Sequence, residues 1–162
     1  MIFSDPFRGR AEEVLADARA KGIKIVTAES CTGGLVAGLL TEIPGSSDVV
    51  ERGFVTYSNQ AKEDLLGVPH ETLEVHGAVS AETARAMALG ALSHAHADLA
   101  VAVTGIAGPG GGSADKPVGL VHFAAARGDR VIQRECRFGD IGRSEVRMAS
   151  VAVALEMLEQ MI

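Results

Sequence analysis

The chain has 162 residues, of which 47% are hydrophobic, and it carries a formal net charge of -6 with a pI near 5.3. Its length and composition predict one globular domain, residues 1–162, and the acidic balance argues against broad binding to nucleic acid or anionic membranes. No apolar segment approaches the length of a membrane span and the N-terminus lacks a signal-peptide pattern, so we expect a cytoplasmic protein.

Helical and strand patterns alternate along the chain, with glycine, proline and capping residues between them. The predicted helices are Arg8 to Lys21, Leu35 to Ile43, a short helix through Leu66, Pro69 to His76, Ala81 to Ala97 and Arg143 to Ile162. Asn59 is the predicted cap of the short helix, and Ser80 is the predicted N-cap of Ala81 to Ala97. The predicted strands are Ile23 to Thr27, Val49 to Tyr57, Asp98 to Thr104, Val118 to Ala126 and Arg130 to Phe138.

The strand patterns differ in kind, which predicts the type of sheet. Asp98 to Thr104 is an unbroken apolar run, as expected of a central strand covered on both faces. The last two strands are joined across Arg-Gly-Asp, which is typical of an antiparallel hairpin. The sequence therefore predicts an α/β fold, a three-layer α/β/α sandwich with a mixed β-sheet.

A cluster of small polar residues separates the first predicted strand from the helix that begins at Leu35. It contains Ser30, Cys31 and Thr32, followed by Gly33 and Gly34. Such a turn directs backbone N–H groups and the positive end of a helix dipole at one spot, where a phosphate, a carboxylate or an oxyanion can bind. Ser30 could be a nucleophile here, or it could cap the helix.

Two further residues could carry out nucleophilic chemistry. A thiol at a helix N-terminus is acidified, so Cys31 is a candidate thiolate, although packing would also explain it. Lys62 could act as the base for a serine if burial lowered its pKa toward neutrality, but a lysine on a short helix is ordinarily solvated. Ser47 follows Pro-Gly in a turn, where hydrogen bonding within the turn is the ordinary role.

Two features near the end of the chain suggest ligand contacts. The segment Gly105 to Pro117 is rich in glycine and proline and follows a buried strand, so we expect a binding loop. Arg143 and Arg147 lie one helical turn apart and could clamp a phosphate, although surface ion pairs would also explain them. The five histidines show no metal-ligand spacing.

Six motifs, taken together and in order, resemble the C-terminal domain of the competence-damage-inducible CinA family. They are Thr27-Ala-Glu-Ser-Cys-Thr-Gly-Gly34, Pro44-Gly-Ser-Ser47, Tyr57-Ser-Asn-Gln-Ala-Lys62, Gly77-Ala-Val-Ser80, Val103-Thr-Gly-Ile-Ala-Gly-Pro109 and Lys116-Pro-Val-Gly119. Stand-alone members of that family hydrolyse the carboxamide of nicotinamide mononucleotide to nicotinic acid mononucleotide and ammonia. The resemblance covers nearly the whole chain and implies this activity and an α/β/α fold.

The resemblance also implies a mechanism, that of a metal-free serine hydrolase without a cofactor. By motif, Ser47 would be the nucleophile, Lys62 the base and Tyr57 a second proton relay, while Ser30 is the rival nucleophile. Residues that would bind substrate belong to two turns and the last helix. They are Glu29, Cys31, Thr32, Gly33, Thr104, Gly105, Ala107, Gly108 and Arg143.

Other outcomes stay open at the level of the sequence. The chain could be a cysteine amidase that uses Cys31, or a catalytically silent module that binds a nucleotide or regulates another protein. The resemblance implies a small-molecule nucleotide substrate and a homo-oligomer. Either Arg143 or Arg147 could hold the phosphate of that substrate.

Overall fold

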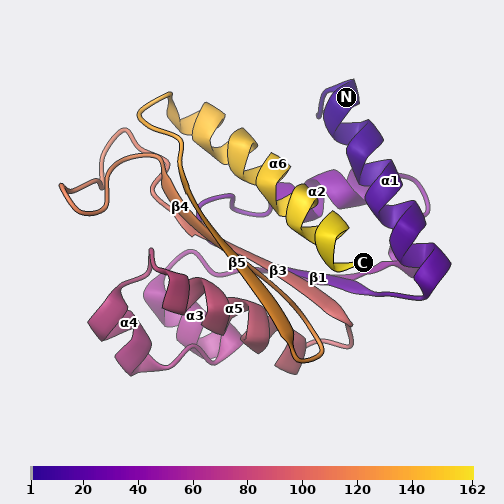
Figure 1. Cartoon of the computed structure of the whole chain (residues 1–162), viewed down its shortest axis with the longest axis horizontal. Helices are drawn as coiled ribbons and strands as arrows, with labels where there is room; N and C mark the ends of the chain where they lie inside the picture. The colour runs from indigo at the N-terminus through magenta and orange to yellow at the C-terminus, as the bar shows by residue number, and fades with distance from the viewer. Residues whose placement is uncertain (1) are drawn as a thin grey trace.

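The computed structural model describes residues 2–162, which form a five-stranded sheet with helices on both faces (Figure 1). The strands are β1 (Ile25–Glu29), β2 (Val50–Val55), β3 (Leu99–Gly105), β4 (Leu120–Arg127) and β5 (Arg130–Arg137). The helices are α1 (Asp5–Lys21), α2 (Leu35–Glu42), the 3-10 turn η1 (Ser46–Asp48), α3 (Asn59–Leu66), α4 (His70–His76), α5 (Ala81–Ser93) and α6 (Arg143–Met161).

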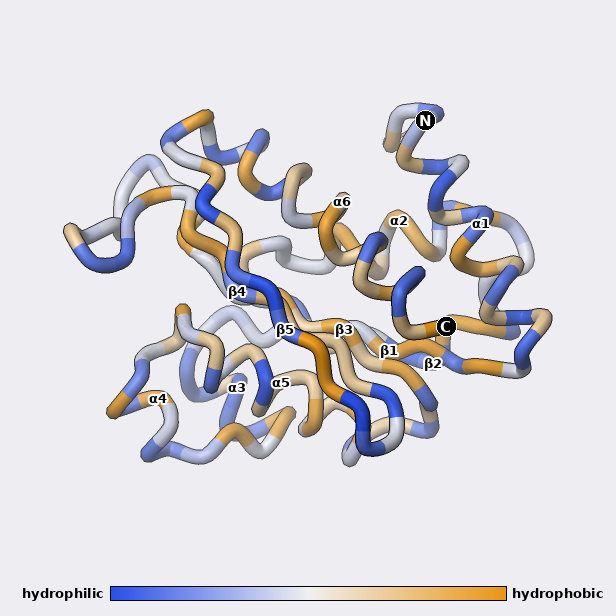
Figure 2. Tube along the Cα trace, viewed as in Figure 1, coloured by the Kyte–Doolittle hydropathy of each residue, from blue (hydrophilic) through white to orange (hydrophobic). Residues whose placement is uncertain are grey.

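The strand order is β2-β1-β3-β4-β5, and the sheet is mixed as predicted. β1 runs parallel to both β2 and β3, whereas β4 is antiparallel to β3 and β5. β3 is buried along nearly all of its length, which confirms the central strand predicted from its apolar run. Figure 2 shows hydrophilic stretches along the edge strand β5, in contrast with the more hydrophobic strands beside it.

The helices form two layers, one on each face of the sheet (Figure 1). Helices α1, α2 and α6 enclose the larger hydrophobic cluster, which includes Leu15, Leu39, Phe123 and Leu155. Helices α3, α4 and α5 cover the other face, where small alanine side chains of β3, β4 and α5 allow close packing around Met87. The predicted three-layer α/β/α sandwich is confirmed.

Several predicted boundaries are wrong by one to four residues, for local reasons. The first strand begins at Ile25 rather than Ile23, because the Ile23 N–H still closes the end of α1 through the Ala18 carbonyl at 2.9 Å. The cap of α3 is Ser58 rather than Asn59, since the Ser58 hydroxyl accepts a hydrogen bond from the Ala61 N–H. Helix α5 ends at Ser93, four residues before the predicted Ala97.

The strand order places a switch point at the carboxyl ends of β1 and β3. From β1 the chain passes through α2 to β2 on one side, and β3 pairs on the other side of β1. Open α/β sheets bind ligands at such a point, because the connections leave a crevice there. Within residues 2–162, no helix combines the length and apolar character needed to cross a bilayer.

Candidate active site

Ser30 and Lys62 meet at the carboxyl end of the parallel strands. Ser30 directly follows β1, and its N–H donates to the Val103 carbonyl of β3 at 2.9 Å. Lys62 lies in α3, which follows β2, and its Nζ lies 3.0 Å from the Ser30 Oγ. Because β1 and β2 are parallel, the segments after both strands reach the same edge of the sheet.

Lys62 is a buried cation surrounded by oxygen atoms. Lys62 is only 1% exposed, and its Nζ lies 2.9 Å from the carbonyl oxygen of Thr56 and 3.4 Å from that of Tyr57. Burial lowers the pKa of Lys62 to about 8, while the nearby Cys31 thiol acts in the opposite direction. About a tenth of Lys62 is therefore uncharged at pH 7, compared with a far smaller fraction of an ordinary lysine.

The contacts of Lys62 determine how its uncharged amine is oriented. A neutral amine has two N–H donors and one lone pair, whereas carbonyl oxygens can only accept hydrogen bonds. The Thr56 and Tyr57 carbonyls therefore take the two donors, which leaves the lone pair facing the Ser30 hydroxyl. In this state Ser30 donates to Lys62, which is the arrangement that general-base catalysis requires.

Glu29 forms the N-terminal cap of α2. Its carboxylate accepts hydrogen bonds from the N–H groups of Val36 at 2.9 Å and Ala37 at 3.0 Å, and the residue is 1% exposed. These oxygens satisfy free donors of the helix and Glu29 does not line the pocket, so its predicted role in substrate binding stays a prediction. The same contacts remove these donors from any ligand, so the α2 N-terminus is not the anion site that the sequence suggested.

The turn after Ser30 retains one backbone donor beside the pocket. The Ser30 carbonyl accepts a hydrogen bond from the Gly33 N–H at 3.0 Å, and Gly33 and Gly34 adopt positive φ angles of 56° and 100°. Among residues 2–162, the Cys31 N–H makes no hydrogen bond to another residue, and Cys31 lines the pocket. Thr32 is fully buried and Gly33 does not line the pocket, so their side of the turn faces away from it.

The Cys31 thiol is not activated. Burial raises its pKa to about 11, and the residue is only 6% exposed. The sequence suggested an acidified thiol at a helix N-terminus, but Glu29 occupies that helix end and desolvation dominates. At neutral pH the thiol is protonated and is a poor nucleophile.

The end of β3 and the loop after it form the opposite wall of the pocket. Thr104, Gly105, Ala107 and Gly108 line it, as the sequence led us to expect. The Thr104 hydroxyl donates to the Ala78 carbonyl at 2.7 Å and so holds the segment between α4 and α5 against the sheet. The hydroxyl oxygen keeps its acceptor capacity, whereas its proton is used within the protein.

Ala78 and Val79 also line the pocket, although the sequence reasoning assigned them no role. They lie in the Gly77-Ala-Val-Ser80 motif, where the Gly77 carbonyl accepts bonds from the hydroxyls of Ser80 and Thr83. The signal that could have indicated their role was the motif itself, a connection between two predicted helices. What the sequence did not indicate is that the connection packs beside the end of β3.

Arg143 lies at the mouth of the pocket and bridges its two sides. Its Nη1 donates to the Gly108 carbonyl at 2.9 Å and its Nη2 to the Tyr57 Oη at 3.0 Å. Tyr57 is 63% exposed, and no hydrogen bond among residues 2–162 links its hydroxyl to Ser30 or Lys62. The predicted proton relay through Tyr57 is therefore not supported by these contacts.

Arg147, one turn further along α6, does not line the pocket. It donates from Nε to the Cys31 carbonyl at 3.0 Å and from Nη2 to the Thr32 carbonyl at 3.3 Å. Of the two arginines that the sequence proposed as a phosphate clamp, only Arg143 is placed to meet a ligand. The pocket that it borders has a volume of about 270 Å³.

Ser47 lies at the other end of the sheet. It belongs to η1, which precedes β2, and the carbonyl of the neighbouring Val49 accepts the N–H of Ile25 at the start of β1. The six residues of β2 separate η1 from the segment that leads to Lys62, a span of about 20 Å. This placement contradicts the expectation that Lys62 takes a proton from Ser47.

Comparison with known proteins agrees with this fold. A family model described as "CinA C-terminal domain" matches residues 8–162. The chain belongs to the CinA C-terminal domain family. "Nicotinamide-nucleotide amidohydrolase PncC" of Escherichia coli K12, a relative in this family, is 53% identical over 152 residues, which cover 93% of this chain and 91% of that protein.

Two other similar proteins differ in how much of their length the match covers. A "Putative competence-damage inducible protein" of Caldicellulosiruptor bescii is 51% identical over 93% of this chain, but the match covers only 36% of that protein. Among solved structures, competence/damage inducible protein CihA of Agrobacterium tumefaciens has a TM-score of 0.97 and 57% identity, covering 99% of this chain and 98% of that one.

Proposed function

We propose that this chain hydrolyses the carboxamide of nicotinamide mononucleotide to nicotinic acid mononucleotide and ammonia, as part of pyridine nucleotide salvage. The observation that carries the proposal is the 3.0 Å contact between the Lys62 amine and the Ser30 hydroxyl in a pocket bordered by an arginine. The choice of substrate follows from the relatives that are named nicotinamide-nucleotide amidohydrolases. The proposed nucleophile is Ser30, not Ser47.

The first half of the reaction transfers the acyl group to Ser30. The Ser30 Oγ attacks the carboxamide carbon while its proton moves to the neutral Lys62 amine. The Cys31 N–H stabilises the oxyanion that forms. The C–N bond then breaks, Lys62 returns the proton to the departing nitrogen, and ammonia leaves an ester on Ser30.

The second half of the reaction releases the acid. A water molecule attacks the ester carbon and gives a proton to Lys62, which is again uncharged. The bond between the carbon and the Ser30 Oγ breaks, and the proton on Lys62 returns to that oxygen. One water is consumed per turnover, and the enzyme is restored with no metal ion or cofactor in any step.

The mouth of the pocket suits the rest of the nucleotide. The guanidinium of Arg143 can bind the 5′-phosphate through two parallel hydrogen bonds, in exchange for its contact with Tyr57. The exposed Tyr57 ring borders the same opening and can pack against the sugar or the pyridine ring. This arrangement favours the nucleotide over free nicotinamide.

The test is ammonia release from nicotinamide mononucleotide by purified protein, with three single variants. Ser30→Ala is expected to reduce kcat by at least 10³-fold, because it removes the nucleophile. Ser47→Ala is expected to stay within about twofold of wild type, as a matched serine at the far end of the sheet. Cys31→Ala is expected to keep most activity, because its protonated thiol is not used.

Each alternative has its own signature in this experiment. An inactive Cys31→Ala together with an active Ser30→Ala would identify a cysteine amidase. Loss of activity in Ser47→Ala, with the fold intact by circular dichroism, would overturn the choice of serine. Wild-type protein that binds the nucleotide but releases no ammonia would be a catalytically silent module.

A further inference from the structure

Arg147 is half-buried, and the proposed reaction does not yet use its contacts. Within residues 2–162, both hydrogen bonds of its guanidinium go to backbone carbonyls, those of Cys31 and Thr32. Hydrogen bonds from a charged donor are roughly twice as strong as neutral ones. Helix α6 is therefore hydrogen-bonded to the turn that carries Ser30, although the two segments are more than 100 residues apart in the chain.

Peptide geometry connects these contacts with the catalytic donor. A trans peptide is planar, so its C=O and N–H point in opposite directions. The Ser30 carbonyl is turned inward to the Gly33 N–H, which directs the Cys31 N–H outward from the turn. The Gly33 N–H holds the Ser30–Cys31 peptide itself, and Arg147 fixes the carbonyls of the next two peptides, so charged hydrogen bonds stabilise the turn that sets its orientation.

We propose that Arg147 is a positioning residue that holds the Cys31 N–H in place as the oxyanion donor for the reaction at Ser30. This inference rests on the proposed function, in which Ser30 is acylated. Arg147 touches neither substrate nor Ser30 side chain, and it acts through the turn. Glu29 complements it from the other side, by fixing the start of α2 with two hydrogen bonds to its carboxylate.

The fit of the turn around Arg147 supports a specific role. A Cβ added to Gly33 would lie 3.3 Å from the Arg147 Nη2, so the guanidinium packs directly against this glycine. Gly33 also has a positive φ of 56°, which a side chain disfavours. The guanidinium and the turn are thus matched in shape as well as in hydrogen bonding.

The experiment separates kcat from KM in four variants. Arg147→Ala is expected to lower kcat by about 10²-fold with KM within twofold of wild type, because only the transition state carries the oxyanion. Arg147→Lys keeps the charge but loses the two-pronged geometry, so an intermediate loss in kcat is expected. Arg143→Ala is expected to raise KM rather than to lower kcat, because the Arg143 side chain lines the pocket and meets the substrate.

Arg127→Ala is the matched control for a purely structural effect. Its Nη1 also donates to a carbonyl, that of Met161, at 2.9 Å, and this exposed residue lies at the end of β4 remote from Ser30. This variant is expected to leave kcat and KM unchanged even if it lowers the melting temperature. If Arg147→Ala fails to fold, Arg147→Lys gives the same comparison.

A reversible inhibitor supplies a readout that does not depend on turnover. The analogue of the mononucleotide with an aldehyde in place of the carboxamide adds to the Ser30 hydroxyl and forms a tetrahedral oxyanion. Its affinity is expected to fall about 10²-fold in Arg147→Ala, whereas the affinity for nicotinic acid mononucleotide stays constant.

The outcomes distinguish this inference from the function on which it rests. Wild-type protein without amidase activity would overturn both. If the wild type is active and the Arg147 variants keep its kcat, the role of Arg147 alone is overturned. The same holds if kcat falls and KM rises by the same factor while the affinity for the aldehyde stays unchanged. A loss of kcat in Arg127→Ala equal to that in Arg147→Ala would mean that the effect is general destabilisation.

Discussion

At the scale of single residues, the protein buries an ionisable amine at the base of its pocket. Lys62 is among its largest fully buried side chains, and carbonyl oxygens rather than a carboxylate surround the amine. A carboxylate at that place would stabilise the charged form and raise the pKa, which would leave no base for Ser30. Carbonyls satisfy the N–H groups while burial still lowers the pKa.

The pH dependence of the reaction follows from this environment. Only uncharged Lys62 can accept the Ser30 proton, and its pKa is about 8. We expect kcat/KM to rise with pH through an apparent pKa near 8 and then to level off, since kcat/KM reports ionisations of the free enzyme. Initial rates between pH 6 and 10 would measure this. A rate that is constant across that range would contradict the role of Lys62.

The same shift predicts how stability depends on pH. In the unfolded chain Lys62 has its ordinary pKa of 10.5, so below pH 8 it is protonated in both states and its burial costs about 3 kcal/mol. Between pH 8 and 10.5 the folded state loses its proton first, and the unfolded state then binds more protons. The free energy of unfolding therefore rises with pH across this window.

Lys62→Met tests this dependence by removing the charge with little loss of volume. The stability of wild type relative to Lys62→Met is expected to increase by about 3 kcal/mol from pH 8 to pH 10.5, as measured by urea unfolding. The variant is also expected to be inactive. A stability difference that does not change with pH would show that Lys62 has the same pKa in both states.

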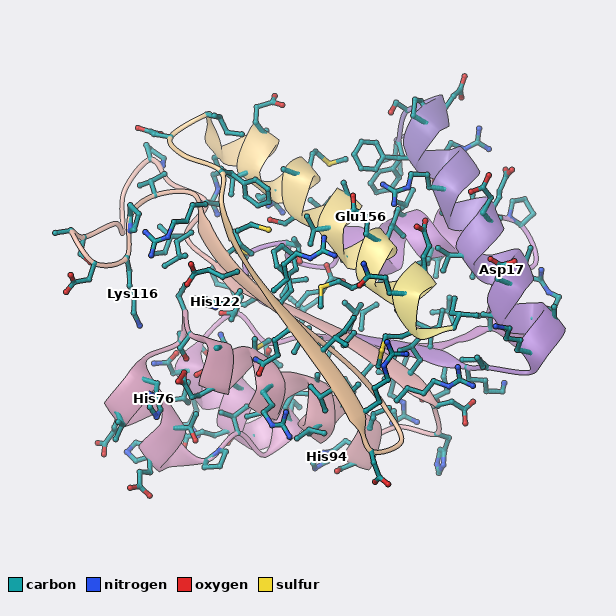
Figure 3. All side chains as sticks on the ribbon, viewed as in Figure 1. Asp17, His76, His94, Lys116, His122 and Glu156 are labelled. Atoms are coloured by element: carbon teal, nitrogen blue, oxygen red, sulfur yellow. The ribbon has the colours of Figure 1, made fainter. Side chains whose placement is uncertain are left out.

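At the scale of elements, the glycine-rich loop after β3 is held at defined points. The Ile106 N–H donates to the Leu120 carbonyl, and the Gly119 N–H donates back to the Ile106 carbonyl at 2.8 Å. Lys116 extends from the loop toward α4 and its Nζ lies 2.6 Å from the His76 carbonyl (Figure 3). The loop is therefore a wall of the pocket that is tied to the last residue of α4.

Two glycines of this loop form a matched pair for mutation. Gly108 has a φ of 85°, and a Cβ there would lie 2.6 Å from the Val118 Cγ1, whereas a Cβ at Gly110 meets nothing within 4 Å. Gly108→Ala is expected to lower stability by about 1–3 kcal/mol and to raise KM, because its carbonyl holds Arg143. Gly110→Ala is expected to stay within about 0.5 kcal/mol.

Thermal unfolding and steady-state kinetics on both variants would check this pair. Equal effects in Gly108→Ala and Gly110→Ala would mean that the loop tolerates or resists side chains as a whole. The predicted contrast depends on one backbone conformation and one close approach, both specific to Gly108.

At the scale of the whole molecule, strand order and direction determine which groups meet. The order β2-β1-β3, with these three strands parallel, gathers the segments after all three at one edge of the sheet. Ser30 and Lys62 come from those segments and Thr104 from the end of β3, while η1 with Ser47 lies at the opposite end of the strands. Assembly as a homo-oligomer stays a prediction that the contacts within one chain do not address.

The proposed chemistry is complete with side chains and water, which predicts insensitivity to metal removal. Ser30 supplies the nucleophile and Lys62 moves the protons, so no step needs a Lewis acid. Among residues 2–162, no three His, Cys, Asp or Glu side chains are grouped to hold a metal ion. Protein dialysed against EDTA is expected to keep full activity. Activity lost to EDTA and restored by a divalent cation would contradict the mechanism.

The sequence by itself determined the elements, the sheet type and a short set of candidate residues. Hydrophobic periodicity and capping residues are local signals, so the buried strand β3, the hairpin and the Ser80 cap of α5 followed directly from them. The family motifs likewise gathered most residues that line the pocket, including Ser30, Lys62 and Thr104.

Only the tertiary structure decided what these residues do. Ser47 and Ser30 both lie in family motifs, and spacing cannot rank them as nucleophiles, whereas the parallel pairing of β1 with β2 places them at opposite ends of the sheet. Tertiary packing makes Glu29 the cap of α2 and raises the pKa of the Cys31 thiol. It also places Arg143 at the pocket and Arg147 on the turn after Ser30. Proximity and burial depend on strand order and on contacts between distant segments, and spacing along the chain does not encode either.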